Sequence, residues 1–138
     1  MTRSSSAGFL ELHEPGADRR PTGDRGERAA ESYLRSRGIE ILERGFRIRG
    51  GEIDLIGREG REIVFIEVKA RSSGRFGHPS ESVTFSKQRR IIRAASFYLV
   101  SRGSWDHPCR FDVVTVRFEK GGAPEIEHLR DAFRTGAR

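Results

Sequence analysis

The sequence GEIDLIGREGREIVFIEVKAR, residues 51–71, decides the fold. Residues 52–58 and 62–69 are each typical of a β-strand, and the polar residues 58–61 between them predict a short hairpin connection. The first half of the second strand, Ile63-Val64-Phe65-Ile66, is apolar on both of its sides. Such a strand needs cover on both faces, so we expect it at the centre of the sheet.

The flanking sequence predicts two helices and three more strands around this hairpin. Asp24 and Glu27 have the spacing of a capping box, which predicts a helix that starts at Asp24 and stops at Gly38. The remaining segments are a strand over 39–48 with a possible bulge at Gly45, a polar loop over 70–82, a helix over 84–101 and strands over 110–118 and 125–129. The order α-β-β-β-α-β-β predicts an α/β fold, a mixed sheet flanked by helices.

The length of 138 residues suits one domain. We expect a flexible N-terminal tail over 1–21, a folded domain over 22–133 and a C-terminal tail over 134–138. The longest apolar runs fall far short of the ~20 residues of a membrane span, which argues against a membrane protein. The single cysteine, Cys109, and the lack of an apolar segment after Arg3 favour a reducing cytoplasm.

The basic residues are concentrated in one segment. The whole chain has a net charge of +6, while residues 69–102 hold eight Lys and Arg against Glu81 alone, a local charge of 8 − 1 = +7. A concentrated basic patch is typical of a polyanion partner, most often nucleic acid. The simpler alternative is a solvated face in an arginine-rich protein.

Three ionisable residues of the central hairpin suggest chemistry. Side chains alternate along a strand, so Glu67 and Lys69 share one face, and hairpin pairing can bring Asp54 beside Glu67. Two close carboxylates repel each other, and a divalent cation between them, Mg²⁺ or Mn²⁺, would relieve that repulsion. The alternative is a buried ion network with Lys69 that binds no metal.

The spacing Asp-x₁₂-Glu-x-Lys from Asp54 to Lys69 is the pattern of the PD-(D/E)xK nuclease superfamily. Further motifs accompany it: Gly26-Glu27, Tyr33-Leu34, Gly38, the stretches 51–56 and 65–71, Lys87, Tyr98-Leu99 and the stretch 110–114. With them, residues 24–133 resemble the uncharacterised bacterial YraN family and, more distantly, the archaeal Holliday-junction resolvases. The proline that precedes the first acidic residue in the superfamily is replaced here by Ile53.

The resemblance implies a restriction-endonuclease-like fold and metal-dependent hydrolysis of phosphodiester bonds. Asp54 and Glu67 would ligate Mg²⁺ (or Mn²⁺), with the backbone carbonyl of Val68 as a third oxygen. Lys69 would orient or help deprotonate the attacking water, and Glu27 would approach the metal through water. Simpler roles are a helix cap for Glu27 and a surface position for Lys69.

The resemblance and the basic segment together predict a nuclease acting on DNA, on branched or repair intermediates. The alternative is a non-catalytic nucleic-acid-binding or scaffold protein with the same fold. Since the resolvases act as dimers, we expect a homodimer. The candidate nucleic-acid contacts are Arg71 and Arg75 in the loop and Lys87, Gln88, Arg89 and Arg90 on the second helix, where a solvated basic face is the alternative.

Overall fold

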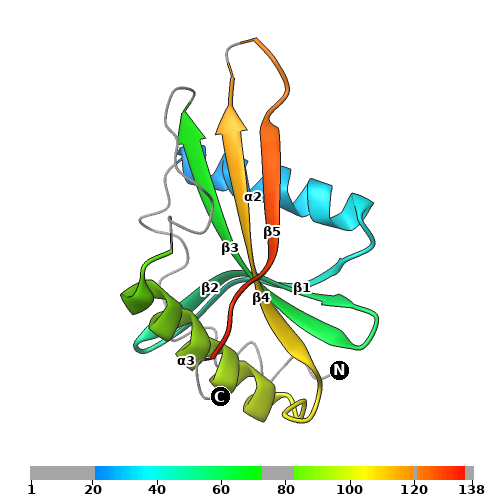
Figure 1. Cartoon of the computed structure of the whole chain (residues 1–138), viewed down its shortest axis with the longest axis vertical. Helices are drawn as coiled ribbons and strands as arrows, with labels where there is room; N and C mark the ends of the chain where they lie inside the picture. Colours follow the sequence, from blue (N-terminus) through cyan, green and yellow to red (C-terminus); the bar gives the residue numbers. More distant parts are fainter. Residues whose placement is uncertain (1–20, 73–82, 120, 136–138) are drawn as a thin grey trace.

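The computed structural model describes residues 21–72, 83–119 and 121–135, and their side chains from residue 24 onward. A five-stranded sheet lies between two helices (Figure 1). The elements are α2 (Pro21–Ser36), β1 (Glu40–Ile48), β2 (Gly51–Glu59), β3 (Glu62–Ser72), α3 (Phe85–Ser101), β4 (Cys109–Phe118) and β5 (Glu125–Phe133). No helix of this described part is long and apolar enough to span a membrane.

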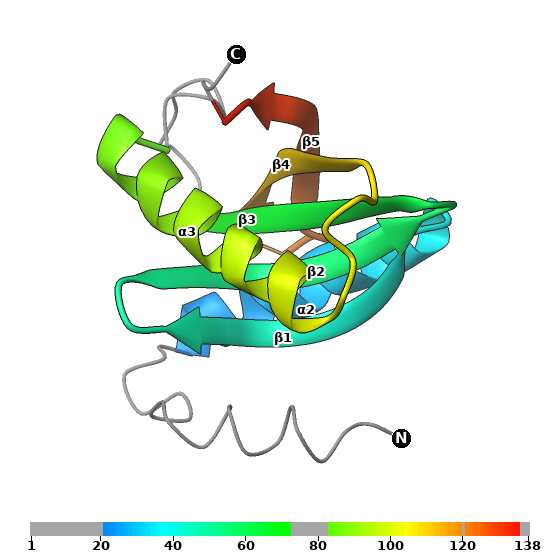
Figure 2. The same ribbon diagram turned by 90° about the horizontal axis from the view of Figure 1, so that it is seen from below.

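The sheet is mixed, with the strand order β1-β2-β3-β4-β5. Strands β3 and β4 are parallel, and α3 connects them, whereas the other three neighbouring pairs are antiparallel. Viewed from below, α3 lies in front of the sheet and α2 behind it (Figure 2). The predicted α/β fold and element order are therefore confirmed, with the mixed sheet and flanking helices expected of a restriction-endonuclease-like domain.

Each face of the sheet carries its own apolar core. On one face, Phe65 packs against Tyr98 of α3, with their ring centroids 6.0 Å apart. On the other face, Val64 packs in the same cluster as Ala30 and Leu34 of α2. The four residues 63–66 are at most 4% exposed, so β3 is covered on both sides as its sequence predicts.

The predicted capping box at Asp24 is wrong. Helix α2 begins at Pro21, so Asp24 lies in the first turn rather than at the N-cap. A proline suits the start of a helix because its missing N–H would have no intrahelical acceptor there. Asp24 is therefore not the N-cap that the predicted capping role of Glu27 requires.

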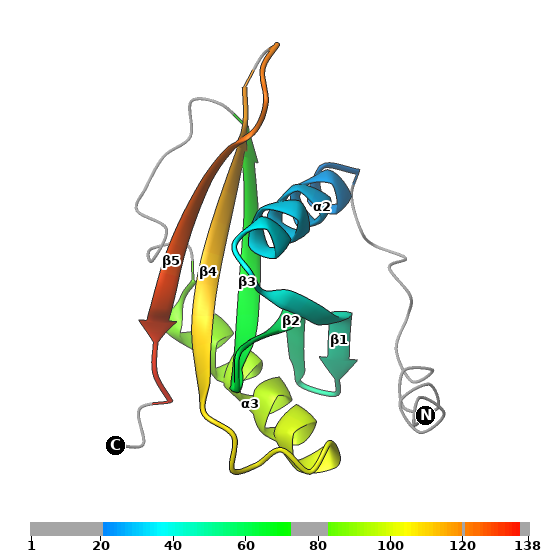
Figure 3. The ribbon, with the colours of Figure 1, turned by 90° about the vertical axis from the view of Figure 1, so that its right-hand side faces the viewer.

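The predicted bulge at Gly45 is also wrong. The register of β1 against β2 shifts between Ile41 and Glu43, and it runs on unchanged past Gly45. Gly45 nevertheless has a left-handed backbone (φ 60°), which an L-residue rarely adopts. Figure 3 shows the β1–β2 hairpin curving away from the long strands β3, β4 and β5.

Two strands are longer than predicted. Strand β3 continues to Ser72, because its parallel ladder with β4 extends as far as Phe118. Strand β5 continues to Phe133, whose ring stacks on Phe111 at a centroid distance of 5.0 Å. The predicted loop over 70–82 thus begins as strand, and residues 73–82 lie outside the described part.

Gly51 lets β2 pass directly beneath α3. A Cβ at this position would lie 2.6 Å from the carbonyl oxygen of Arg90 and 3.1 Å from Cβ of Ala94. Gly51→Ala must therefore push α3 away from the sheet, and we expect it to lower the free energy of unfolding by about 1–3 kcal/mol. Urea denaturation beside Gly122→Ala, where a Cβ would meet nothing within 4 Å, measures the effect; equal stability of the two variants would contradict the prediction.

Candidate active site

Asp54 lies where the backbone ladder between β2 and β3 ends. The last pair in register is Leu55 opposite Ile66, and the same register places Asp54 opposite Glu67. Beyond this pair, the N–H of Val68 donates a hydrogen bond of 2.8 Å to Oδ2 of Asp54. The Asp54 carboxylate thus takes the place of a backbone acceptor, which fixes it beside the C-terminal half of β3.

Glu67 is the buried centre of the site, with only 4% of it exposed. Its Oε2 lies 3.0 Å from Nζ of Lys87 and 3.7 Å from Nζ of Lys69. The sequence predicts Lys87 as a nucleic-acid contact, whereas in the structure its ammonium group pairs with Glu67. We call Asp54 and Glu67, with Glu27 nearby, the acidic cluster. Both lysines remain about one-third exposed, so both can also meet an incoming anion.

The pKa values report how crowded the charges are. Burial, and then the charges of Glu67 and Glu27, raise the pKa of Asp54 well above its ordinary value, against the opposing hydrogen bond from Val68. Burial alone would lower the pKa of Lys87, but the charge and hydrogen bond of Glu67 outweigh it and raise the pKa. The cluster therefore favours additional positive charge beside Asp54.

A close helix–strand contact brings Glu27 to the cluster. A Cβ at Gly26 would lie 2.8 Å from Cβ of Ala70, so α2 crosses the end of β3 at a distance that only glycine permits. Glu27 follows directly on this contact and is near enough for its charge to raise the pKa of Asp54. The structure thus pairs Asp54 of β2 with Glu67 of β3 and brings Glu27 of α2 within electrostatic range of Asp54.

The donor atoms at this place suit a hard cation. Asp54, Glu67 and the Val68 carbonyl offer only oxygen, the donor that Mg²⁺ and Mn²⁺ prefer. Burial raises the pKa of Asp54 most, and the repulsion from Glu67 that raises it further is what such a cation would offset. Among residues 24–72, 83–119 and 121–135, no three His, Cys, Asp or Glu side chains are arranged to hold a metal, so a cation here would rest on two carboxylates and the Val68 carbonyl.

Comparison with known proteins identifies the family. The profile of the uncharacterised protein family UPF0102 matches residues 26–116. The chain belongs to the UPF0102 family. The UPF0102 protein of Hahella chejuensis is 53% identical over 111 residues, which cover 80% of this chain and 88% of that protein. The UPF0102 protein of Geobacter metallireducens is 48% identical over 111 residues, covering 80% and 90%.

The UPF0102 match confirms the resemblance to the YraN family, since both names denote one family. A UPF0102 protein of Symbiobacterium thermophilum is 46% identical over 114 residues, 83% of this chain and 97% of that protein. The part matched by the UPF0102 profile runs from the second turn of α2 into β4. It therefore contains every residue of the acidic cluster and both of its lysines.

Three of the predicted nucleic-acid contacts of this UPF0102 chain are Arg71, Arg75 and Gln88. The structure places Arg71 and Gln88 differently from the prediction, and it does not describe Arg75. Arg71 is half-buried near the end of β3, and Arg75 is the one outside the described residues. Gln88 donates from Nε2 to the carbonyl of Val83 at 3.1 Å, so its amide holds the chain entering α3. Of these three, Arg71 lies in β3 and shares its strand face with Glu67 and Lys69.

Arg89 and Arg90 are exposed on the outer side of α3 in this UPF0102 fold. The guanidinium of Arg89 lies over the Phe85 ring, 5.8 Å from its centroid. That of Arg90 lies 4.0 Å from Oε2 of Glu52. Both arginines are available to phosphates, and neither belongs to the cluster around Glu67.

A second polar cluster of the UPF0102 fold, centred on Asp112, is only partly predictable from the sequence. The sequence suggests only that Asp112 could pair with an arginine, whereas the structure buries Asp112 completely and joins it to both Arg110 and His128. The alternation of Arg110, Asp112 and Val114 along one strand was the available signal. His128 comes from β5, and no sequence pattern paired it with β4.

Proposed function

We propose that this UPF0102 protein is a Mg²⁺- or Mn²⁺-dependent nuclease that hydrolyses DNA phosphodiester bonds in branched or repair intermediates. The carrying observation is the convergence of Asp54 and Glu67 from adjacent strands, with the pKa of Asp54 raised in part by the charge of Glu67. Membership of the YraN family supports the proposal through the nuclease-like fold. We place the reaction in the cytoplasm and expect the dimer that symmetric cuts would need.

In this proposal Asp54, Glu67 and the Val68 carbonyl would hold the cation, which would make a water more acidic and offset charge on the phosphate. Lys69 lies on the same strand face as Glu67 and orients the attacking water or helps to deprotonate it. Lys87, 3.0 Å from Glu67, is placed to offset charge on the scissile phosphate. Glu27 holds water at the edge of the cluster.

A second candidate function is nucleic-acid binding without catalysis. The observation that favours it is the pairing of Glu67 with Lys87 and Lys69, which already neutralises the buried carboxylate of this site without a metal. In that case the acidic cluster is a structural ion network, and the basic surface of α3 alone engages the polyanion.

A cleavage panel separates the two candidates. Labelled duplex, single-stranded, flap and four-way substrates are incubated with the full chain in Mg²⁺, in Mn²⁺ and in EDTA. The nuclease proposal expects products with either metal and none in EDTA. Binding in EDTA without products under any of these conditions would favour the binding protein.

Charge removal on α3 tests the nucleic-acid surface. The double variant Arg89→Ala/Arg90→Ala should weaken duplex binding and flatten the slope of log affinity against log salt by ~0.9 for each phosphate that the variant no longer neutralises. Fluorescence anisotropy at several salt concentrations measures the slope. The control Arg58→Ala/Arg61→Ala removes two exposed arginines at the turn of the β2–β3 hairpin, which is the end far from Asp54 and Glu67. A slope equal to that of the control would place the bound phosphates elsewhere on the protein.

A further inference from the structure

A groove runs between α3 and the chain that follows β5. Figure 1 shows this last described segment reaching α3 from the end of β5. The groove has a volume of about 510 Å³, which is the size of a small-ligand site. Its lining residues are Phe85, Gln88, Arg89, Ile92, Arg93, Ser96, Arg134 and Thr135.

An aromatic ring stands open at one end of this groove. Phe85 is 71% exposed, more than any other large hydrophobic residue in the described part of the chain. Ile92 lies two turns further along α3 and continues the apolar floor. An exposed ring with a guanidinium above it, here that of Arg89, is an arrangement on which a nucleic-acid base can stack.

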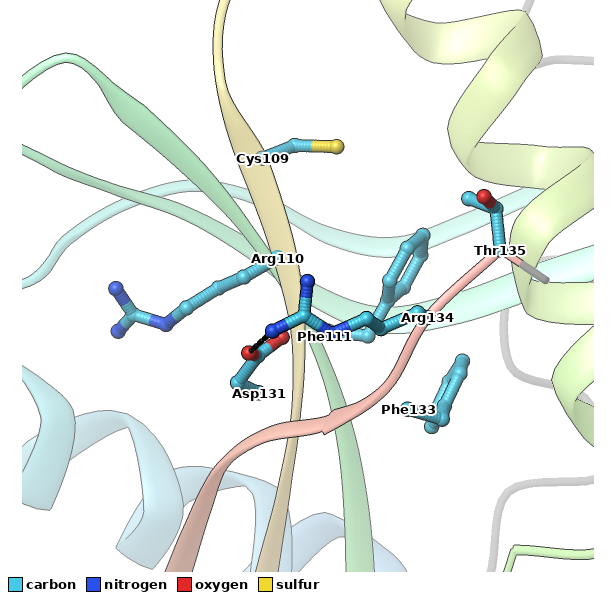
Figure 4. Close-up of a pocket in the computed structure, with 7 residues that line it drawn as sticks. All are labelled: Cys109, Arg110, Phe111, Asp131, Phe133, Arg134 and Thr135. Atoms are coloured by element: carbon cyan, nitrogen blue, oxygen red, sulfur yellow. Dashed lines mark hydrogen bonds and ion pairs between the residues drawn. The ribbon is translucent and has the colours of Figure 1, made fainter. Parts of the chain in front are cut away.

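The charged side chains that the described part of the chain contributes to the groove are all basic. They belong to Arg89, Arg93 and Arg134, and none of the described lining residues is a carboxylate. An adjoining hollow of about 480 Å³ shares Arg134 and Thr135 but also contains Asp131, whose carboxylate pairs with Arg134 at 2.6 Å (Figure 4). The groove on α3 therefore complements an anion that also carries flat rings.

The groove starts at the same turn of α3 that serves the acidic cluster. Phe85 and Lys87 both lie in the first turn, and Lys87 reaches Glu67 at 3.0 Å. Residues two positions apart in a helix are separated by about 200° around its axis, so the side chains of Phe85 and Lys87 point to opposite sides of α3. A strand held at both places must pass around the end of the helix, which a rigid duplex cannot do and an unpaired strand can.

We infer that this groove binds an unpaired stretch of a nucleic-acid strand, with a base stacked on Phe85 and phosphates on Arg89 and Arg134. This inference rests on the proposed function. For the proposed nuclease, it means that the substrate carries a single-stranded segment next to the bond that is cut. Fully paired DNA meets the arginines of α3 but leaves Phe85 unused.

Binding without metal tests the groove independently of cleavage. Fluorescein-labelled oligothymidylate and a blunt duplex of equal length are titrated with the full chain in EDTA and followed by anisotropy. Phe85→Ala should weaken binding of the single strand by about 10-fold or more and change duplex binding by less than twofold. Phe85→Trp should restore it, with quenching of the new indole fluorescence when a base stacks.

The matched control is Trp105→Ala, which removes an aromatic side chain that is 64% exposed but does not line the groove. This control should bind both probes like the wild type. Equal single-strand affinities of Phe85→Ala and Trp105→Ala would overturn the inference. Displacement of the oligonucleotide by polyglutamate from wild type and Phe85→Ala alike would also overturn it, in favour of an acidic peptide site.

The cleavage panel then separates this inference from the proposed function. Phe85-dependent single-strand binding in EDTA, with no cleavage in Mg²⁺ or Mn²⁺, would overturn the nuclease proposal and leave the groove assigned. Cleavage of flap and blunt duplex substrates at equal rates by wild type and Phe85→Ala would overturn the groove inference and support the nuclease proposal. Faster cleavage of flaps than of duplexes, abolished in Phe85→Ala, supports both.

Discussion

Asp54→Asn and Glu67→Gln are each expected to lower the rate of metal-dependent cleavage by about 10³-fold or more. Either change removes a charged oxygen ligand, and the loss of a bound cation forfeits several kcal/mol of transition-state stabilisation. Lys69→Ala should retain metal binding and lose about 10²–10³-fold in turnover, as for one electrostatic stabiliser. Single-turnover cleavage with Mg²⁺ measures all three.

The same variants should differ in stability. The pKa of Asp54 is raised, so the folded protein binds this proton more tightly than the unfolded chain does, and without metal its stability falls as the pH rises through that pKa. Asp54→Asn should therefore preserve or raise the melting temperature in EDTA at neutral pH. Glu67→Gln leaves Lys69 and Lys87 without their buried partner and should lower it.

Melting curves in EDTA and in Mg²⁺ provide the check. Mg²⁺ should raise the melting temperature of wild type and of Lys69→Ala, because it binds only the folded state, and should not shift Asp54→Asn. The control is Glu40→Gln, an exposed carboxylate paired with Arg58 on the surface. If Asp54→Asn, Glu67→Gln and Lys69→Ala all melt early and Mg²⁺ shifts none of the proteins, the cluster is a structural ion network and the nuclease proposal fails.

The central hairpin was predictable because its information is local. Apolar residues on both sides of β3 require cover on both faces, and the structure provides a core on each. The two-residue connection between Glu59 and Glu62 fixes the register, and that register sets Asp54 opposite Glu67. The acidic pair follows from strand periodicity and hairpin pairing alone.

The place of Lys87 depends on how α3 lies across the sheet, which no local pattern encodes. Its helical periodicity predicts which side faces the core but not which strand end receives the first turn. The misplaced helix start has a different cause: a carboxylate is favoured both at the N-cap and within the first turn of a helix. Asp24 therefore predicts that a helix begins nearby but does not fix the residue at which it begins.

The second large effect is expected at Asp112, which is 0% exposed. Oδ1 of Asp112 accepts hydrogen bonds from Nε of Arg110 at 3.0 Å and from the N–H of Asp131 at 2.9 Å. Oδ2 lies 2.8 Å from Nε2 of His128. One carboxylate thus joins two strands and a buried guanidinium.

The network extends to the β2–β3 turn, because Arg110 also donates from Nη1 to Glu59 and Glu62, at 2.8 Å each. The hydrogen bond from the Asp131 N–H to Asp112 lies where the pairing of β4 with β5 is irregular. The register of β4 against β5 shifts between Phe111 and Val113, and Asp131 has a left-handed backbone with a φ of 54°. The Asp112 side chain accepts the backbone N–H of the irregular residue.

Asp112→Ala should therefore lower the free energy of unfolding by about 3–5 kcal/mol at neutral pH, the usual cost of leaving a buried ionic partner unpaired. The control Asp106→Ala removes an aspartate that is 90% exposed and should change little. Urea denaturation of wild type and both variants measures the difference. If Asp112→Ala is as stable as Asp106→Ala, the network contributes nothing to the attachment of β5.

The pH dependence gives this prediction a second measurement. Burial alone would raise the pKa of Asp112, but hydrogen bonds from His128, Arg110 and the Asp131 amide outweigh it and lower the pKa. A lowered pKa in the folded state contributes stability above the unfolded-state value, and this contribution is lost as the pH falls through the folded-state value. The gap in stability between wild type and Asp112→Ala should therefore narrow in acid, because protonation removes from the wild type the charge that the variant already lacks. A gap that stays constant from neutral to strongly acidic pH would assign the effect to poorer packing instead.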